Sequence, residues 1–218
     1  MKSIHNNSQF FHVNAKTAKN PNRPNLLAKI WKKIEKVFIF SARNVISPFS
    51  PRAGTRLMTS FYRKNGMRIV GQPGFIASSV WFDGTDYSLI ELNEGCTVSG
   101  YVRVLTHDWS LYAVGRGMGL KMEKPIGILR PVRIGRCAFI GMGAILLPGA
   151  DVGDGAIVGA GSVVRGKVPS WTIVVGSPAQ PAGGSREYLF KNLERMGLTE
   201  LLHEARQIME NSSKESRE

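Results

Sequence analysis

Aliphatic residues recur at every sixth position through the second half of the chain, and a small or β-branched residue follows four positions after each. A heptad or a helix-turn-helix repeat does not fit this period, whereas one short strand and one turn do. The pattern therefore predicts a solenoid in which three units close a triangular coil of about 18 residues. The aliphatic positions are Ile128, Ile134, Ile140, Leu146, Val152, Val158 and Val164.

Each aliphatic residue is expected to point into the coil, and each small residue to lie beside a tight corner where glycine supplies the turn geometry. Successive coils then stabilise one another by stacking. The predicted stacks are Ile128, Leu146 and Val164 on one face, Ile134 and Val152 on the second, and Ile140 and Val158 on the third.

The same period occurs earlier, clearly at Leu92, Val98 and Val104 and more weakly at Ile76 and Phe82. Between Val104 and Ile128 the phase is kept, but the aliphatic positions are lost. This glycine-rich, charged interval predicts a long loop over about 108–126 that leaves the coil, and loops of that length are usually functional. The repeating domain is expected to cover residues 69–182.

The flanking segments have other patterns. Residues 1–24 are polar and predict a disordered leader. Residues 25–68 predict a basic helical segment whose first helix has Asn25 as its N-cap and alternates lysines with apolar residues at helical spacing. A second basic helix is expected to end at Gly66. Residues 183–218 predict one or two helices divided at Gly197, followed by a disordered tail.

Positive charge is concentrated before the repeats. Of 29 Lys and Arg residues, 14 precede residue 71, where Glu35 is the single acid. A lysine-rich helix with Trp and Phe on another face suits the interface of an anionic membrane. Packing on its own domain or on a neighbouring subunit is the alternative. A basic segment can also bind nucleic acid, which we do not expect as a partner of this chain.

We expect a cytoplasmic protein that can also contact the inner face of the membrane peripherally. No stretch of the sequence is long and apolar enough to span a bilayer, and the first residues lack the apolar core of a secretory signal. Cys96 and Cys137 stand in separate repeats without a CxxC spacing, which indicates free thiols that pack beside turns.

His107 is the single histidine within the repeats. In the stretch VRVLTHDWS it stands where the six-residue aliphatic pattern stops. Imidazole is suited to remove a proton from a hydroxyl near neutral pH. A three-histidine zinc site is excluded by this count, and we expect no metal. A partner that orients the ring is expected about 18 residues earlier, on the neighbouring coil, because Asp108 points the other way on an extended segment.

The run IGRCAFIGMGAILLPGADVGDGAIVGAGSVV, followed by VPSWTIVVGSPA, resembles the hexapeptide-repeat acyltransferases. The pattern is most similar to sugar O-acetyltransferases of the maltose, galactoside, nodulation and surface-polysaccharide types, over about residues 89–180. The resemblance implies a mainly β fold, a left-handed parallel β-helix. The basic helical segment before it and the C-terminal helix after it are expected from the residue pattern and lie outside the resemblance. It also implies a homotrimer that uses acetyl-CoA as acyl donor.

The resemblance further implies roles for individual residues. His107 corresponds to the general base, which acts by direct attack of the acceptor on the thioester. Main-chain N–H groups at Gly141 or Met142 would stabilise the oxyanion. Gln180 stands where relatives carry a basic residue, so the phosphates would need Arg165, Lys167 or Arg186. The implied coenzyme-binding residues are Gly141, Met142, Ala160, Gly161, Arg165, Lys167, Gly176 and Pro178.

The segment WFDGTDY provides candidates for binding the acceptor. Asp83 and Asp86 are expected to hold substrate hydroxyls or to steady His107, although capping of turns beside Gly84 is an alternative. Tyr87, together with Trp81 and Trp109, is expected to stack on a sugar ring.

The function expected from these features is acetyl-CoA-dependent O-acetylation of a sugar hydroxyl in surface polysaccharide or glycolipid synthesis, with a sugar or lipid-linked glycan as acceptor. Two alternatives stay open. One is N-acetylation of an amino sugar by the same histidine. The other is a non-catalytic β-helix scaffold whose basic arm binds nucleic acid.

Overall fold

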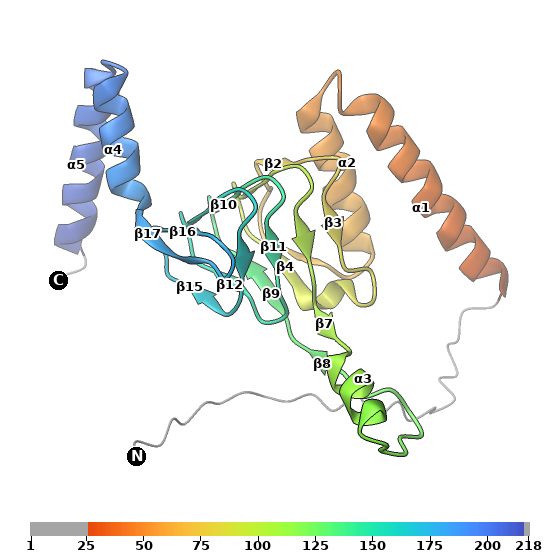
Figure 1. The fold of residues 1–218 in the computed structure, drawn as a ribbon. Helices are drawn as coiled ribbons and strands as arrows, with labels where there is room; N and C mark the ends of the chain where they lie inside the picture. Colours follow the sequence, from red (N-terminus) through yellow and green to blue (C-terminus); the bar gives the residue numbers. More distant parts are fainter. Residues whose placement is uncertain (1–25, 216–218) are drawn as a thin grey trace, which may run out of the picture.

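The computed structural model describes residues 26–215, and a stack of short strands forms its centre (Figure 1). Helices α1 (Leu26–Ile46) and α2 (Pro51–Lys64) precede this stack, and α4 (Ser185–Arg195) and α5 (Thr199–Glu215) follow it. The predicted leader, the expected N-cap Asn25 and residues 216–218 lie outside the described residues. The strands are β1 (Arg68–Ile69), β2 (Phe75–Ile76), β3 (Trp81–Phe82), β4 (Ile90–Leu92), β5 (Thr97–Val98), β6 (Arg103–Val104), β7 (His107–Asp108), β8 (Ile128–Leu129), β9 (Val132–Ile134), β10 (Phe139–Ile140), β11 (Ile145–Leu146), β12 (Asp151–Val152), β13 (Ile157–Val158), β14 (Val163–Val164), β15 (Lys167–Val168), β16 (Thr172–Val175) and β17 (Gln180–Gly184).

The strands form three sheets that wind around one axis. Sheet A has the order β1-β4-β9-β12-β15, sheet B the order β17-β16-β13-β10-β5-β2, and sheet C the order β14-β11-β6-β3. Apart from the antiparallel pair β16–β17, all neighbours within these sheets are parallel. Because consecutive strands of one coil fall in different sheets, each coil is a triangle, as the six-residue period predicted.

The register agrees with most of the predicted stacks. Leu146 pairs with Val164 in sheet C, Val152 with Ile134 in sheet A, and Ile140 with Val158 in sheet B. These inward side chains are almost fully buried and form the core together with the small residues at the corners. The core therefore consists of aliphatic columns, one behind each sheet.

Ile128 does not belong to its predicted stack. Its strand β8 pairs antiparallel with β7 outside the three sheets, and Val104 takes the place next to Leu146. The excursion from the coil thus includes Ile128, because its backbone is paired with Asp108 rather than with another coil. Within the predicted loop, Ser110–Gly117 forms helix α3, which projects from the stack (Figure 1).

Close stacking explains glycine at two corners. A Cβ atom at Gly141 would lie 2.6 Å from the backbone nitrogen of Ala160, and one at Gly153 would lie 2.4 Å from that of Ser170. Real Cβ atoms do not approach backbone this closely, so a larger residue at either corner would push the coils apart.

Helix α1 packs against α2, and α2 packs against strands β1 and β2 of the first coil. Ser50 caps α2 by accepting a hydrogen bond from the Ala53 N–H (3.3 Å), and Pro51 occupies its first turn, where a missing N–H costs nothing. Phe61 and Tyr62 of α2 are buried in the common core. The sequence predicted a basic helical segment here, and the structure adds that its second helix closes the N-terminal end of the stack.

Helices α4 and α5 form a hairpin beyond β17, and Gly197, with φ of +68°, lies between them at the predicted break. The prediction of a disordered tail from Asn211 onward is wrong for its first five residues, because α5 extends to Glu215. None of the helices within 26–215 combines the length and hydropathy needed to cross a bilayer.

Candidate active site

His107 lies at the corner between sheets C and A, where the chain leaves the coil. The preceding residue, Thr106, is fully buried, whereas the His107 side chain is 24 % exposed. Strand β7 then pairs with β8, so that His107 lies opposite Leu129. The ring is thus held on a short two-stranded ribbon and still reaches solvent.

Asp83 is the residue that orients His107. Its Oδ2 atom contacts the imidazole Nδ1 and also accepts hydrogen bonds from the Thr106 hydroxyl (2.6 Å) and the Thr106 N–H (3.2 Å). Its Oδ1 accepts a hydrogen bond from the Thr85 N–H (3.0 Å). Asp83 is 2 % exposed. Both carboxylate oxygens are therefore engaged by the protein, which leaves Asp83 little capacity to bind substrate hydroxyls.

The environment of Asp83 keeps its carboxyl ionised. Burial alone would raise the pKa of Asp83, but the hydrogen bonds from Thr106, Thr85 and His107 outweigh burial and hold the pKa well below its usual range. An ionised carboxylate can only accept hydrogen bonds, so the proton in this contact sits on the His107 Nδ1. The lone pair of Nε2 is then free to accept a proton, which is the requirement for a general base.

Sequence reasoning named Asp83 but missed Thr85 and Thr106. Asp83 precedes His107 by 24 positions rather than about 18. The coil is longer here because the turn from Asp86 to Leu89 adds residues between Phe82 and Leu92. The sequence did offer a signal for Thr106, because a threonine directly before the histidine can donate its hydroxyl hydrogen to the carboxylate that orients the imidazole.

The other predicted acceptor-binding residues are dispersed. Trp109 lies next to the imidazole, with ring centroids 5.7 Å apart, and is 41 % exposed. Asp86 caps the turn that follows it by accepting hydrogen bonds from the N–H (2.9 Å) and hydroxyl (2.6 Å) of Ser88. Tyr87 packs edge-on against Phe61 and Tyr62, so its ring takes part in the packing between helix α2 and the coil.

The pKa of Tyr87 is raised, first by burial and then by the negative charge of Asp83. Tyr87 is therefore coupled electrostatically to the site. Trp81 points outward from sheet C and is exposed. Of the aromatic residues proposed for sugar stacking, Trp109 therefore lies next to the imidazole.

Most predicted coenzyme-binding residues occupy a different corner, the one between sheets B and C. Met142 follows β10 there, Ala160 and Gly161 follow β13, and Gly176 lies on top of the same corner, where its carbonyl accepts a hydrogen bond from the Val163 N–H (2.9 Å). Ala160 and Gly161 are exposed, as are Gly176 and Pro178 nearby. This corner thus has a row of small, accessible residues.

The two predicted oxyanion donors differ. The Gly141 N–H donates to the Val158 carbonyl (2.8 Å) and is therefore not available. Within the described residues, the Met142 N–H makes no hydrogen bond, and the Met142 side chain is exposed. Of the pair, Met142 is the residue whose N–H has no acceptor among the described residues.

The basic candidates are also divided among the corners. Arg165 follows β14 at the corner of His107, and its charge acts on Asp108. The pKa of Asp108 is lowered first by hydrogen bonds from Ser110, whose N–H donates at 2.8 Å, and then by Arg165. Lys167 is exposed on sheet A, whereas Arg186 stacks on Trp171 at 4.2 Å, near the corner between sheets A and B.

The two cysteines differ in their environment. Cys96 is buried, and burial raises its pKa to about 12, as expected for a packing residue. Cys137 is exposed, although its Sγ lies close to Gly95 of the neighbouring coil, so its thiol is accessible at the turn. Within residues 26–215, no cluster of three or more His, Cys, Asp or Glu side chains is arranged to hold a metal ion.

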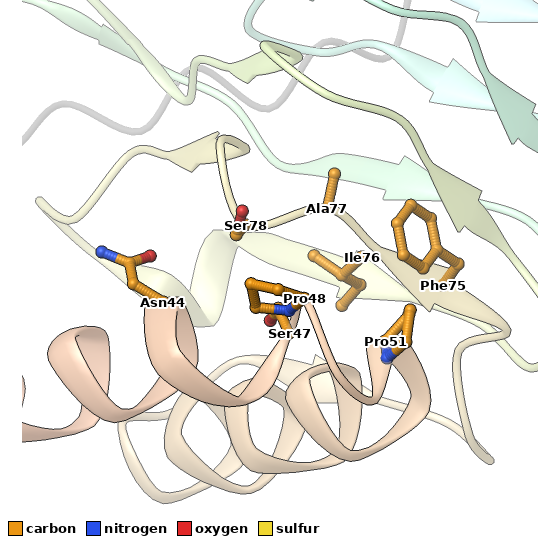
Figure 2. Close-up of a pocket in the computed structure, with 8 residues that line it drawn as sticks. All are labelled: Asn44, Ser47, Pro48, Pro51, Phe75, Ile76, Ala77 and Ser78. Carbon is orange, nitrogen blue, oxygen red and sulfur yellow. The ribbon is translucent and has the colours of Figure 1, made fainter.

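A cavity of about 460 Å³ lies where the turn between α1 and α2 meets β2 (Figure 2). Its lining has no titratable side chain and includes none of the predicted site residues. The cavity is therefore separate from the His107 site. It is lined by Asn44, Ser47, Pro48, Pro51, Phe75, Ile76, Ala77 and Ser78.

Comparison with known proteins supports the repeat. Residues 131–166 match the family model described as bacterial transferase hexapeptide (six repeats). No curated protein matches the chain significantly.

Three solved structures illustrate the similar proteins. A maltose O-acetyltransferase from Clostridium difficile 630 is 24% identical, over 59% of this chain and 75% of that one, with a TM-score of 0.40. A hexapeptide-repeat acetyltransferase from Vibrio cholerae O1 biovar eltor, in complex with acetyl-CoA, is 25% identical over 55% and 60% of the two chains, with a TM-score of 0.45. An N-acyltransferase from Bacillus cereus, in complex with dTDP and coenzyme A, is 17% identical over 65% and 96%, with a TM-score of 0.41.

The matched segment, β9 to β14, stacks directly on the coil that carries His107. The left-handed parallel β-helix that the resemblance implied is thus confirmed, and residues 131–166 of the chain carry the hexapeptide repeat that this family model describes.

Proposed function

We propose that this protein is an acyltransferase that moves the acetyl group of acetyl-CoA to a sugar hydroxyl, with His107 as general base. The observation that carries the proposal is the contact between the buried, ionised Asp83 and the His107 Nδ1. This contact fixes the tautomer whose Nε2 accepts a proton, on a ring that is still accessible to substrate.

The proposed reaction is a direct transfer. The His107 Nε2 takes the proton of the acceptor hydroxyl as its oxygen attacks the thioester carbonyl carbon. A new C–O bond forms, the C–S bond breaks, and the imidazolium returns its proton to the departing thiolate. Asp83 stays ionised throughout and stabilises the positive charge that His107 carries between the two transfers.

The exposed B–C corner supports binding of the pantetheine arm. Small residues at Ala160, Gly161 and Gly176 let an extended chain approach the backbone, and the Met142 N–H is placed to bind the developing oxyanion. With Gln180 in place of a basic residue, the phosphates would meet Arg165 or Lys167, both of which are exposed.

A homotrimer would bring the two corners together. His107 lies at the C–A corner and the donor residues at the B–C corner, with sheet C between them. One protomer therefore presents the two halves of the site on different corners, and a neighbour is needed to complete each. Such a split site is possible at a heterologous, ring-closing interface.

The outer surfaces of the sheets support this assembly. Sheet A carries charged residues outward, joined in a ladder by Arg68–Glu91 (3.4 Å) and Arg133–Asp151 (3.2 Å). Sheet B instead carries Phe139, Ile157 and Ile173 outward. Charged ladders suit solvent, whereas an apolar column is better covered by a partner. We therefore place sheet B, and not sheet A, towards neighbouring subunits.

The acceptor that we propose is a sugar or lipid-linked glycan used in surface polysaccharide or glycolipid synthesis, with Trp109 beside His107 as the stacking residue. The protein would act in the cytoplasm at the inner face of the membrane. The exposed apolar residues of α1 support that location.

The test is turnover of acetyl-CoA with a panel of sugar acceptors, followed as release of free thiol. His107→Ala is expected to lower kcat by about 10²- to 10⁴-fold, while the oligomer seen by light scattering is unchanged. His203→Ala, on the exposed surface of α5, is the matched control and is expected to retain full activity. Equal turnover by the His107→Ala variant would refute the proposal.

A further inference from the structure

One side of helix α1 is fixed to the body of the protein. Arg43 is buried and stacks over Phe40 at 4.7 Å, and the Phe40 ring meets Phe61 of α2 edge-on at 5.7 Å. Glu35 pairs with the Lys64 ammonium at 2.5 Å. These contacts lie at helical spacing along α1 and therefore set its rotation. The opposite side cannot turn inward without breaking them.

That opposite side is apolar and open to solvent. Trp31 is 69 % exposed and Phe38 72 %, and Phe49, in the turn after α1, is 88 % exposed. Ile34 and Val45, which lie between these residues along the chain, are also exposed. We call these five residues the apolar face. Large apolar side chains gathered on one side of a helix mark a surface that is covered in use.

The net charge of the N-terminal segment, as read from the sequence, indicates what covers the apolar face. Residues 1–70 contain 14 Lys and Arg residues and one acid, Glu35, which is already paired with Lys64. Two copies of such a segment would repel each other, because nearly all of the charge has the same sign. An anionic lipid surface attracts it, and each basic residue near that surface contributes about 1 kcal/mol.

We infer that the apolar face inserts into the headgroup region of an anionic phospholipid membrane, with α1 lying along the surface. Trp31, Phe38 and Phe49 enter the boundary between headgroups and acyl chains, where aromatic side chains are favoured. The positive charge of residues 1–70 supplies the attraction to lipid phosphates. The inference does not depend on the transfer reaction, and it adds the residues that dock to the location proposed above.

Flotation of the full-length protein with vesicles tests the inference. Phosphatidylcholine vesicles with phosphatidylglycerol should carry the protein upward, and vesicles of phosphatidylcholine alone should carry much less. The triple variant Trp31→Ser, Phe38→Ser, Phe49→Ser is expected to bind anionic vesicles on the order of a hundredfold more weakly, because three large apolar side chains no longer leave water. Raising the salt concentration should weaken binding of the unaltered protein.

The matched control replaces three exposed apolar residues of the C-terminal hairpin, as Tyr188→Ser, Met196→Ser and Leu201→Ser. This variant should float like the unaltered protein. Light scattering and circular dichroism establish that both variants keep their assembly and fold. Equal flotation of both variants would overturn the inference. So would a smaller oligomer for the first variant without any flotation of the unaltered protein, since the apolar face would then be a contact between copies. Turnover is measured separately on soluble sugars, so a failure of docking is distinguishable from a failure of the proposed chemistry.

Discussion

The Nδ1 atom of His107 lies against the Oδ2 atom of Asp83, a carboxylate that is almost fully buried and also bonded to the Thr106 hydroxyl. The two residues are 24 positions apart and come from neighbouring coils. Their contact leaves one imidazole nitrogen free and accessible. The consequences for catalysis, stability and assembly can each be measured.

Replacement of the orienting carboxylate should mainly affect the chemical step. Asp83→Asn is expected to lower kcat on the order of 10²- to 10⁴-fold, because an amide can donate its own hydrogen to Nδ1 and so favour the wrong tautomer. KM for acetyl-CoA should change little, because Asp83 contacts His107, Thr85 and Thr106 and none of the residues proposed to bind the coenzyme. Steady-state kinetics with both substrates give this comparison.

Asp86→Asn is the matched control, because Asp86 bonds only to Ser88 of its own turn within the described residues. We expect its kcat to stay within about threefold of the unaltered value. A loss in Asp83→Asn that appeared only in KM would contradict a role in orienting His107.

Asp83 should also make stability depend on pH in the acid range. Its pKa is lowered in the folded protein, so it adds stability above the pKa of an unfolded aspartate, about 3.9. This contribution is lost as pH falls through the lower folded-state pKa. The difference in unfolding free energy between the unaltered protein and Asp83→Asn should be constant at neutral pH and shrink below about pH 4. Urea titrations at one fixed protein concentration measure it. A difference that grew on acidification would reverse the assigned direction.

A site shared between subunits should allow two inactive variants to restore each other. His107→Ala lacks the base, and Ala160→Trp fills the exposed donor corner with a bulky side chain. In trimers refolded from an equal mixture, about a quarter of the sites should combine an intact base with an intact neighbouring corner. Thiol release by the mixture, compared with each variant alone, measures the recovery. A mixture as inactive as its components would place the whole site in one protomer.

Gly141 should be required for stacking. Gly141→Ala places a Cβ atom 2.6 Å from the Ala160 nitrogen, and separating the coils should cost about 1–3 kcal/mol of unfolding free energy. Gly117→Ala, in helix α3, has no heavy atom within 4 Å of the new Cβ atom and should be neutral or slightly stabilising. Denaturant unfolding of the two variants makes the comparison. Equal stability would show that the corner tolerates a side chain.

The sequence by itself determined the period of the coil and the direction of most side chains. Ile134, Ile140 and Leu146 are fully buried because an alternation of inward and outward positions within each six-residue unit leaves one choice for large aliphatic groups. The same pattern indicated His107 as a chemically distinct residue, since it stands where the six-residue aliphatic period stops. These are local properties, which each unit and its immediate neighbours decide.

Only the tertiary structure decided which residues meet around that histidine. A turn of extra residues between β3 and β4 moves Asp83, rather than a residue 18 positions back, next to the imidazole. The antiparallel pairing of Ile128 with Asp108 removes Ile128 from the stack, although its spacing fits the repeat. Residues far apart along the chain come together through the insertions and corners between them. A period describes the regular part of the chain and carries no information on where those insertions place a side chain.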